Sequence, residues 1–183
     1  MSPNLRAEIA SILNTANDMT IATMRDDGYP QATVVSYASE GFAIYFGTAG
    51  DSQKAKNIAR SDKVSLAVTL PYDDWGEIRG LSLGARAERL TDERQIAHAA
   101  QLLVKKFPRG IAEYASDGLE GVALFRIVPE IVSVLDYRKG FGHTDLVSVS
   151  SWEIEPTPVT GGMRRTLLPH QSVVAWQAKG HEQ

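Results

Sequence analysis

Hydrophobic residues recur at two different periods along this 183-residue chain, and each change of period marks a new element. The first pattern is helical, with one apolar face made of Leu5, Ile9, Ile12 and Leu13. Ser2 precedes it as a typical N-cap residue, and Pro3 is tolerated in a first turn, where its missing N–H has no intrahelical acceptor. The pattern predicts an amphipathic helix that ends at Asn17-Asp18.

Runs of β-prone, partly alternating residues follow, separated by turn residues. They predict strands over residues 19–25, 31–39, 42–48, 63–69, 78–90, 122–137 and 145–149, with an edge strand over 173–176. Asp26–Pro30 and Glu40-Gly41 are turn signals, so neighbouring runs should form hairpins. Gly80 and Gly84 predict a bulge or a close backbone contact within their strand.

Two further segments have helical composition. Ser52 begins a short one that continues to Arg60, and Asp92 begins a longer one that Pro108 ends. The longer one has an inward face of Ile96, Ala99, Ala100, Leu103 and Phe107. Because strands outnumber helices and tight turns join them, we expect a mainly β fold, an antiparallel barrel with flanking helices. It should form one domain over residues 1–150, with residues 151–183 as a C-terminal extension packed on it.

Composition excludes several classes of protein. The chain has no Cys, which excludes disulfides, thiolate catalysis and cysteine metal sites, and its four His are too scattered to predict a metal site. The net charge is −3 without a basic face, so nucleic acid is not an expected partner. No apolar run reaches the ~20 residues of a membrane helix, and the N-terminus lacks a signal pattern. We expect a cytoplasmic protein without membrane contact.

A series of short motifs carries the functional signal. In chain order they are DGYP (27–30), YFGT (45–48), SQKAKNI (52–58), VSL (64–66) and GARAE (84–88). This ordered set resembles the pyridoxamine 5′-phosphate oxidase-like family of FMN-binding split barrels. The resemblance implies an oxidoreductase that transfers a hydride or electrons at FMN, with the flavin at a homodimer interface and a small molecule as substrate or electron donor.

The resemblance places the flavin phosphate where a strand end meets a helix N-terminus, at Gly47, Thr48, Ser52, Gln53 and Lys54. Such an N-terminus offers free N–H groups and a favourable dipole to an anion. Thr48 and Ser52 add hydroxyls, and Lys54 adds a compact positive charge. The alternative interpretation is a plain helix cap beside a solvated lysine.

The strand beneath the isoalloxazine ring is implied to be Gln31, Ala32, Thr33, Val34, Val35 and Ser36. An extended backbone offers N–H and C=O groups at regular spacing to the polar edge of the ring. Val34 and Val35 would offer apolar contact, or would simply belong to the barrel core.

The chain departs from the oxidase itself at three points. Gln53 stands where the oxidase has Arg, Gly80 aligns with a flavin-contacting Gln, and the substrate-binding Arg-x-His is absent. The oxidation of pyridoxamine phosphate is therefore not predicted.

Two loops add candidates. Trp75 lies in one, and the glycine-bracketed segment 138–143 ends at His143, which either donates a proton to a substrate or is an exposed turn residue. Asp136, Tyr137 and Asp145 form either a substrate-facing polar set or a solvated rim, and the rim is the favoured interpretation. Three other functions stay open: a barrel that holds haem or a deazaflavin, with His143 or another His as the axial haem ligand; a flavin carrier or sensor without turnover; and an interaction module with an empty cleft.

Overall fold

The computed structural model describes residues 1–109 and 121–149. The predicted edge strand 173–176 and the predicted extension 151–183 lie outside the described residues. The helices are α1 (Pro3–Thr15), α2 (Gln53–Arg60) and α3 (Glu93–Lys106), with single 3₁₀ turns at Trp75–Glu77 and Tyr137–Lys139. The strands are β1 (Asp18–Met24), β2 (Pro30–Glu40), β3 (Ala43–Ala49), β4 (Lys63–Thr69), β5 (Arg79–Arg89), β6 (Val122–Asp136) and β7 (Thr144–Ser148).

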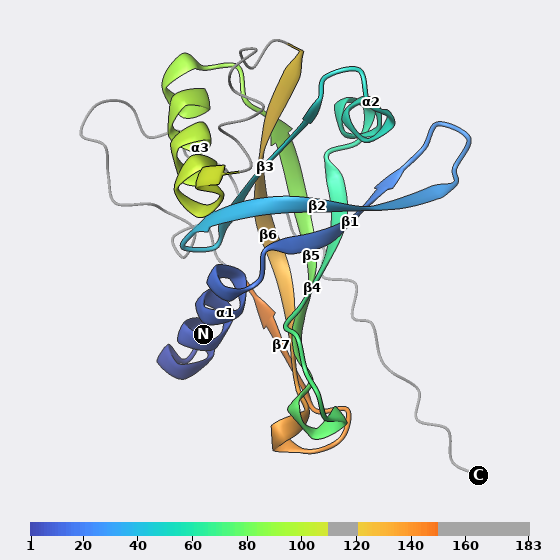
Figure 1. Ribbon diagram of the computed structural model, residues 1–183. Helices are drawn as coiled ribbons and strands as arrows, with labels where there is room; N and C mark the ends of the chain where they lie inside the picture. The colour runs from blue at the N-terminus through green and yellow to red at the C-terminus, as the bar shows by residue number, and fades with distance from the viewer. Residues whose placement is uncertain (110–120, 150–183) are drawn as a thin grey trace.

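These strands form an antiparallel barrel with one additional strand (Figure 1). The sheet order is β3-β2-β1-β4-β5-β6-β7, and pairing of β3 with β6 closes six strands into a barrel. β6 is long enough to pair with β3 through its first half and with β7 through its second half. The predicted mainly β, antiparallel fold with flanking helices is confirmed.

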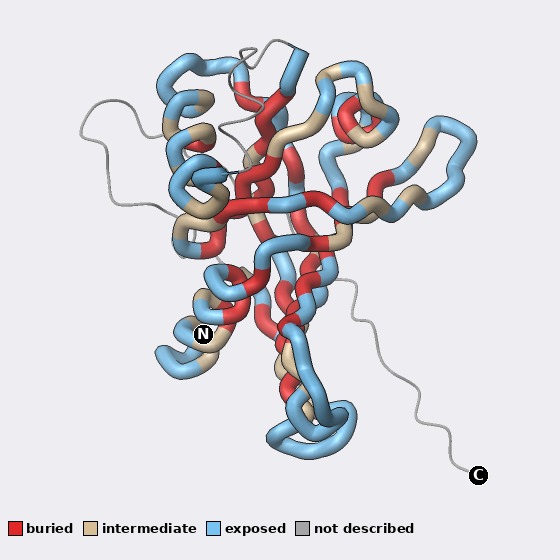
Figure 2. The backbone as a smooth tube through the Cα atoms, in the orientation of Figure 1, coloured by how far each residue is buried: buried red, intermediate tan, exposed pale blue. Residues whose placement is uncertain are grey.

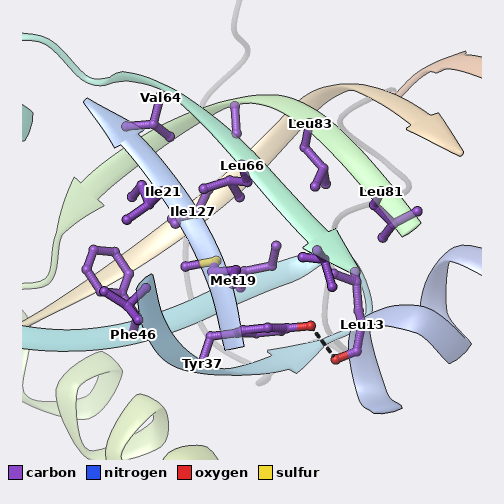
Figure 3. Close-up of a cluster of buried hydrophobic side chains, with 14 of the residues drawn as sticks. Leu13, Met19, Ile21, Tyr37, Phe46, Val64, Leu66, Leu81, Leu83 and Ile127 are labelled. Atoms are coloured by element: carbon purple, nitrogen blue, oxygen red, sulfur yellow. Dashed lines mark hydrogen bonds between the residues drawn. The ribbon is translucent and has the colours of Figure 1, made fainter. Parts of the chain in front are cut away.

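The strand residues that point inward are mostly apolar, so the barrel interior is apolar. Figure 2 shows the buried residues along the strands. Figure 3 shows Met19 and Ile21 of β1 meeting Leu66 of β4 there. Each fully buried side chain of this size contributes about 1.5–3 kcal/mol of transfer free energy. The Tyr37 hydroxyl donates to the carbonyl of Leu13 at 2.9 Å, and this bond attaches α1 to β2.

The predicted helix caps are present. The Ser2, Ser52 and Asp92 side chains each accept a backbone N–H of the first turn of α1, α2 and α3. In α3 the predicted inward face is confirmed, since Ala99 and Leu103 are buried and Ile96 and Ala100 pack beside them.

The two strand glycines occupy special positions, as predicted. A Cβ on Gly80 would lie 2.6 Å from the carbonyl oxygen of Val68, so β5 approaches β4 more closely there than any side chain allows. The register of β5 against β6 shifts between Gly84 and Ala85, which is a β-bulge.

The outer face of the β4–β5–β6–β7 sheet has no charged side chain over three successive register rows. We call this surface the outer face; it consists of Ser65, Ala67, Thr69, Gly80, Ser82, Gly84, Ile131, Ser133, Leu135, Thr144, Leu146 and Ser148. Register continues it onto Thr20 and Ala22 of β1 and Val34 of β2. Val34 is 69% exposed, so the expectation that it belongs to the barrel core is wrong; Val35 is buried.

Within the described part of the chain, no helix is long and apolar enough to cross a membrane.

Candidate functional site

Three predicted site residues meet where β3 leads into α2. The Thr48 and Ser52 hydroxyl oxygens are 3.2 Å apart, and the Lys54 Nζ donates to Thr48 Oγ1 at 3.4 Å. We call these residues the Thr48 cluster. Beside them, Gly47 is closely packed, because a Cβ there would lie 3.1 Å from the end of the Leu124 side chain, which would have to shift. The sequence therefore correctly grouped these positions in one place.

The Thr48 cluster has unused hydrogen-bond donors. Ser52 Oγ accepts the N–H of Ala55, but helix geometry gives the N–H groups of Gln53 and Lys54 no acceptor within α2. Lys54 forms no ion pair with a carboxylate among the residues that the structure describes. Free N–H groups, two hydroxyls and an uncompensated ammonium are the groups that bind an anion at a helix N-terminus.

The second half of the candidate site is a backbone edge of β2. The Tyr37 N–H donates to the carbonyl of Asn17, so the backbone groups of Tyr37 point toward β1. Successive residues of a strand point their backbone groups to opposite edges, so the backbone groups of Ala32, Val34 and Ser36 point to the edge away from β1. β3 pairs with that edge only from Tyr37 to Glu40, and it continues along β6 through its own opposite edge. No described strand pairs with the edge over residues 32–36, which we call the open edge.

The inward side of the same strand segment has a polar atom without a partner. Thr33 Oγ1 is buried and forms no hydrogen bond, while its neighbour Val35 is buried in the apolar interior. Buried polar atoms are normally paired, so an unpaired one next to an unpaired strand edge fits a site for a group with its own donors and acceptors.

A buried asparagine connects the two halves of the site. Asn57 Nδ2 donates to Thr23 Oγ1 of β1 at 3.0 Å and to Gln31 Oε1 of β2 at 3.2 Å. Its Oδ1 accepts from Gln53 Nε2 at 2.9 Å, so Gln53 offers the Thr48 cluster its backbone N–H rather than its side chain. Asn57 belongs to the SQKAKNI motif, but nothing local to the sequence indicates which strands it contacts.

His143 lies far from these residues. In Figure 1, α2 is at the top of the barrel, and the connection from β6 to β7, which contains His143, is at the bottom. His143 Nε2 is 3.1 Å from Asp145 Oδ2. The predicted loops do meet there: the Trp75 ring stacks on that of Phe141, with centroids 6.3 Å apart and planes 9° from parallel.

Asp136 is the centre of a second polar cluster at this lower end. Its side chain is 1% exposed and accepts two hydrogen bonds from the Arg138 guanidinium, at 2.8 and 2.7 Å. Those bonds hold the pKa of Asp136 well below its usual range. Lys139 bridges Glu8 of α1 and Asp145, at 3.1 Å each. The expectation that Asp136 belongs to a solvated rim is wrong.

This Asp136 cluster, made of Asp136, Glu8, Asp145, Arg138 and Lys139, is also where the electrostatics are strongest. The ammonium of Lys139 and then His143 lower the pKa of Asp145, so both aspartates stay ionised beside their cations. In the described residues no group of three or more His, Asp or Glu side chains could hold a metal ion.

Comparison with known proteins identifies the family. The model of the pyridoxamine 5′-phosphate oxidase family matches residues 5–136, which is most of the described chain. The chain belongs to the pyridoxamine 5′-phosphate oxidase family. The match covers both halves of the candidate site, the Thr48 cluster and the open edge, and no curated protein sequence matches the chain.

Solved structures with this split-barrel fold include proteins of several kinds. A haem-binding protein of Mycobacterium smegmatis aligns with a TM-score of 0.68 and 22% identity, over 81% of this chain and 59% of that one. A conserved hypothetical protein of Mycobacterium tuberculosis aligns with a TM-score of 0.66 and 27% identity, over 82% and 93%. The haem storage protein HutZ of Vibrio cholerae aligns with a TM-score of 0.58 and 17% identity, over 69% and 90%. The chain thus shares its fold with proteins that bind haem, and it spans about 59% of the length of the first of them.

Proposed function

We propose that this protein is a cytoplasmic FMN-binding oxidoreductase that holds its flavin at a homodimer interface. One observation carries the proposal: a helix N-terminus with unused N–H groups and an unpaired ammonium lies near an unpaired strand edge and is joined to it through Asn57. A phosphate on a planar, hydrogen-bonding ring system needs those two features together.

The residues present fit FMN. Thr48, Ser52, Lys54 and the first N–H groups of α2 would bind the phosphate, and the ammonium would form a charge-assisted hydrogen bond, the strong kind. The backbone of the open edge would bind the polar rim of the ring, with Thr33 Oγ1 beneath it. When bound, the flavin supplies the hydride or electron transfer, while the protein supplies position and electrostatics.

The departures from the oxidase bear on the substrate. Gln53 replaces a cationic side chain and is bonded to Asn57, so Lys54 is the one side-chain cation of the Thr48 cluster. Gly80 has no side chain and no space for one. Both differences remove a flavin contact of the oxidase, and the absence of its substrate-binding Arg-x-His favours a substrate other than pyridoxamine 5′-phosphate.

The proposed dimer is supported by the outer face. An uncharged surface of small and aliphatic residues can pack against a second copy of itself without repulsion between like charges, as a two-fold contact requires. Four strands spaced about 4.8 Å apart, with three outward residues each and the continuation onto β1 and β2, give roughly 500–800 Å² per subunit. That approaches the ~800 Å² of a standard interface.

A charge placed within the outer face tests the proposed dimer. Ala67→Asp introduces a carboxylate at an exposed strand position, so the monomer should fold, and Gln101→Asp on the exposed side of α3 is the matched control. We expect light scattering to give a dimer mass for the parent and the control and a monomer mass for Ala67→Asp. A parent protein that is monomeric contradicts the dimer, and a dimeric Ala67→Asp contradicts this interface.

The absorbance spectrum of the purified protein, before and after addition of FMN, tests the cofactor. We expect a flavin spectrum and quenching of FMN fluorescence on binding. A Soret band would instead support haem, which the fold neighbours bind, and the mass of the released cofactor separates FMN from a deazaflavin. A colourless protein that does not bind FMN contradicts the proposal and favours the interaction module. A bound flavin that can be reduced but passes its electrons to no acceptor would favour a carrier or sensor.

A further inference from the structure

The Asn57 side chain is the sole polar link from the middle of α2 to both strands beneath the helix, among the described residues. It is 2% exposed and lies one turn after Gln53 on the buried side of α2, between Ala55 and Ile58. Its amide nitrogen donates to both β1 and β2, and its oxygen accepts from within the helix. The side chain therefore joins three elements.

Apolar packing alone does not set where α2 sits along the strands. The helix has eight residues, too few for stability in isolation, and its only buried apolar residues are Ala55 and Ile58. Burial of apolar surface is non-directional, whereas hydrogen bonds tolerate only a few tenths of an ångström and limited angular error. A second bond, from Arg60 to the carbonyl of Met24, holds only the far end of the helix.

The partners of Asn57 lie between the two halves of the candidate site. One turn before Asn57, the N-terminus of α2 presents Ser52 and Lys54, and its β2 partner Gln31 directly precedes Ala32, the first residue of the open edge. A displacement of the helix along β2 would therefore change the separation between the anion-binding groups and the open edge.

We propose that Asn57 is a positioning residue that sets this separation, so that the site selects a flavin carrying a phosphate over the same ring without one. The inference rests on the proposed function and deepens it. Asn57 does not touch the ligand; it acts through Ser52 and Lys54 at one end and through Gln31 at the other.

The test compares the affinities of FMN and riboflavin, which share the ring and differ in the phosphate. In the parent protein FMN should bind more tightly than riboflavin. Asn57→Ala should lower the ratio of the two affinities at least about tenfold, by weakening FMN and leaving riboflavin nearly unchanged. Ile58→Ala is the matched control. Ile58 is a buried neighbour on the same helix, 5% exposed, and its truncation should lower the melting temperature while it leaves the hydrogen bonds of Asn57 in place.

A milder variant keeps the proposal testable if Asn57→Ala does not fold. Thr23→Val removes one hydroxyl from β1 at nearly constant volume, and it should shift the FMN-to-riboflavin ratio in the same direction to a smaller extent. A parent protein that binds neither flavin overturns the proposed function and this inference with it. A parent that prefers FMN, with a ratio unchanged in Asn57→Ala or equally reduced in Ile58→Ala, overturns the positioning role alone.

Discussion

Within residues 1–109 and 121–149, the Thr48 cluster and the Asp136 cluster lie at opposite ends of the barrel, and they differ in whether their charges are paired. In the Asp136 cluster, every carboxylate has a cation within 4 Å, and the cations come from the adjacent 3₁₀ turn. In the Thr48 cluster, the Lys54 ammonium donates to the Thr48 hydroxyl, which also pairs with the Ser52 hydroxyl, and no described carboxylate neutralises the ammonium.

The contrast separates a structural network from a binding site. A cluster whose charges are matched internally has little to gain from a ligand, since binding would have to break existing ion pairs. A cluster with an unmatched cation and unused N–H groups gains from any anion of the right shape. By this criterion we propose that the lower end stabilises the fold and that the upper end binds the ligand, although the lower end has more charged groups.

The largest effect is expected from removing the centre of the paired cluster. Asp136→Ala leaves the Arg138 guanidinium without its bidentate partner and should lower the free energy of unfolding by about 2–3 kcal/mol. Urea denaturation measures this. Glu88→Ala, which removes an exposed ion pair with Arg126, is the control and should leave the denaturation midpoint nearly unchanged. If Asp136→Ala is as stable as the parent, the lower cluster is not a structural network.

The next effect concerns the unpaired cluster. Lys54→Ala removes the ammonium and should weaken FMN binding about ten- to a hundredfold, with little change in stability, because a charge-assisted hydrogen bond is lost. Lys56→Ala, an exposed lysine on the same helix, should change the affinity much less. Fluorescence titration of FMN measures both, and equal affinities for the two variants would show that the anion binds elsewhere.

Local signals were sufficient to predict the Thr48 cluster. Thr48, Ser52 and Lys54 lie in one strand-to-helix connection, so the cap at Ser52 brings them together whatever the rest of the chain does. The helix caps, the close approach at Gly80 and the bulge at Gly84 were predictable for the same reason: each depends on a residue and its immediate neighbours.

Non-local geometry explains what the sequence did not predict. The open edge exists because β3 pairs with β2 only over residues 37–40, while its other edge pairs with β6, whose residues lie about eighty positions farther along the chain. The burial of Asp136 could have been predicted from the strand pattern. Val132 and Val134 point inward, and alternation places Asp136 on the same side of the strand. Nothing in the sequence pattern predicted that Glu8, on α1 near the start of the chain, would join the same cluster through Arg138.

The acid sensitivity of the fold should reflect the paired cluster. Because Arg138 lowers the pKa of Asp136, its contribution to stability is complete above the ordinary aspartate pKa near 4 and is lost as the pH falls below it. The unfolding free energy should therefore fall by up to about 1.4 kcal/mol per pH unit from this group. Thermal melts between pH 5 and pH 2 should show a shallower decline for Asp136→Asn than for the parent, and parallel declines would contradict the lowered pKa.

The smallest effect is expected at His143, and it decides whether the two clusters are independent. The imidazole pairs with Asp145 in a half-exposed position, at the end of the molecule away from α2, and Lys139 already compensates the same carboxylate. His143→Gln keeps a hydrogen-bond donor and should leave both the melting temperature and the FMN affinity nearly unchanged, since exposed ion pairs contribute little. The melting temperature and the FMN affinity of His143→Gln are measured side by side with those of Lys54→Ala. A tenfold loss of FMN affinity in His143→Gln would mean that the lower end of one subunit reaches a flavin site. In the proposed dimer that site would be on the partner subunit, and the division between a structural end and a binding end would then hold only within one chain.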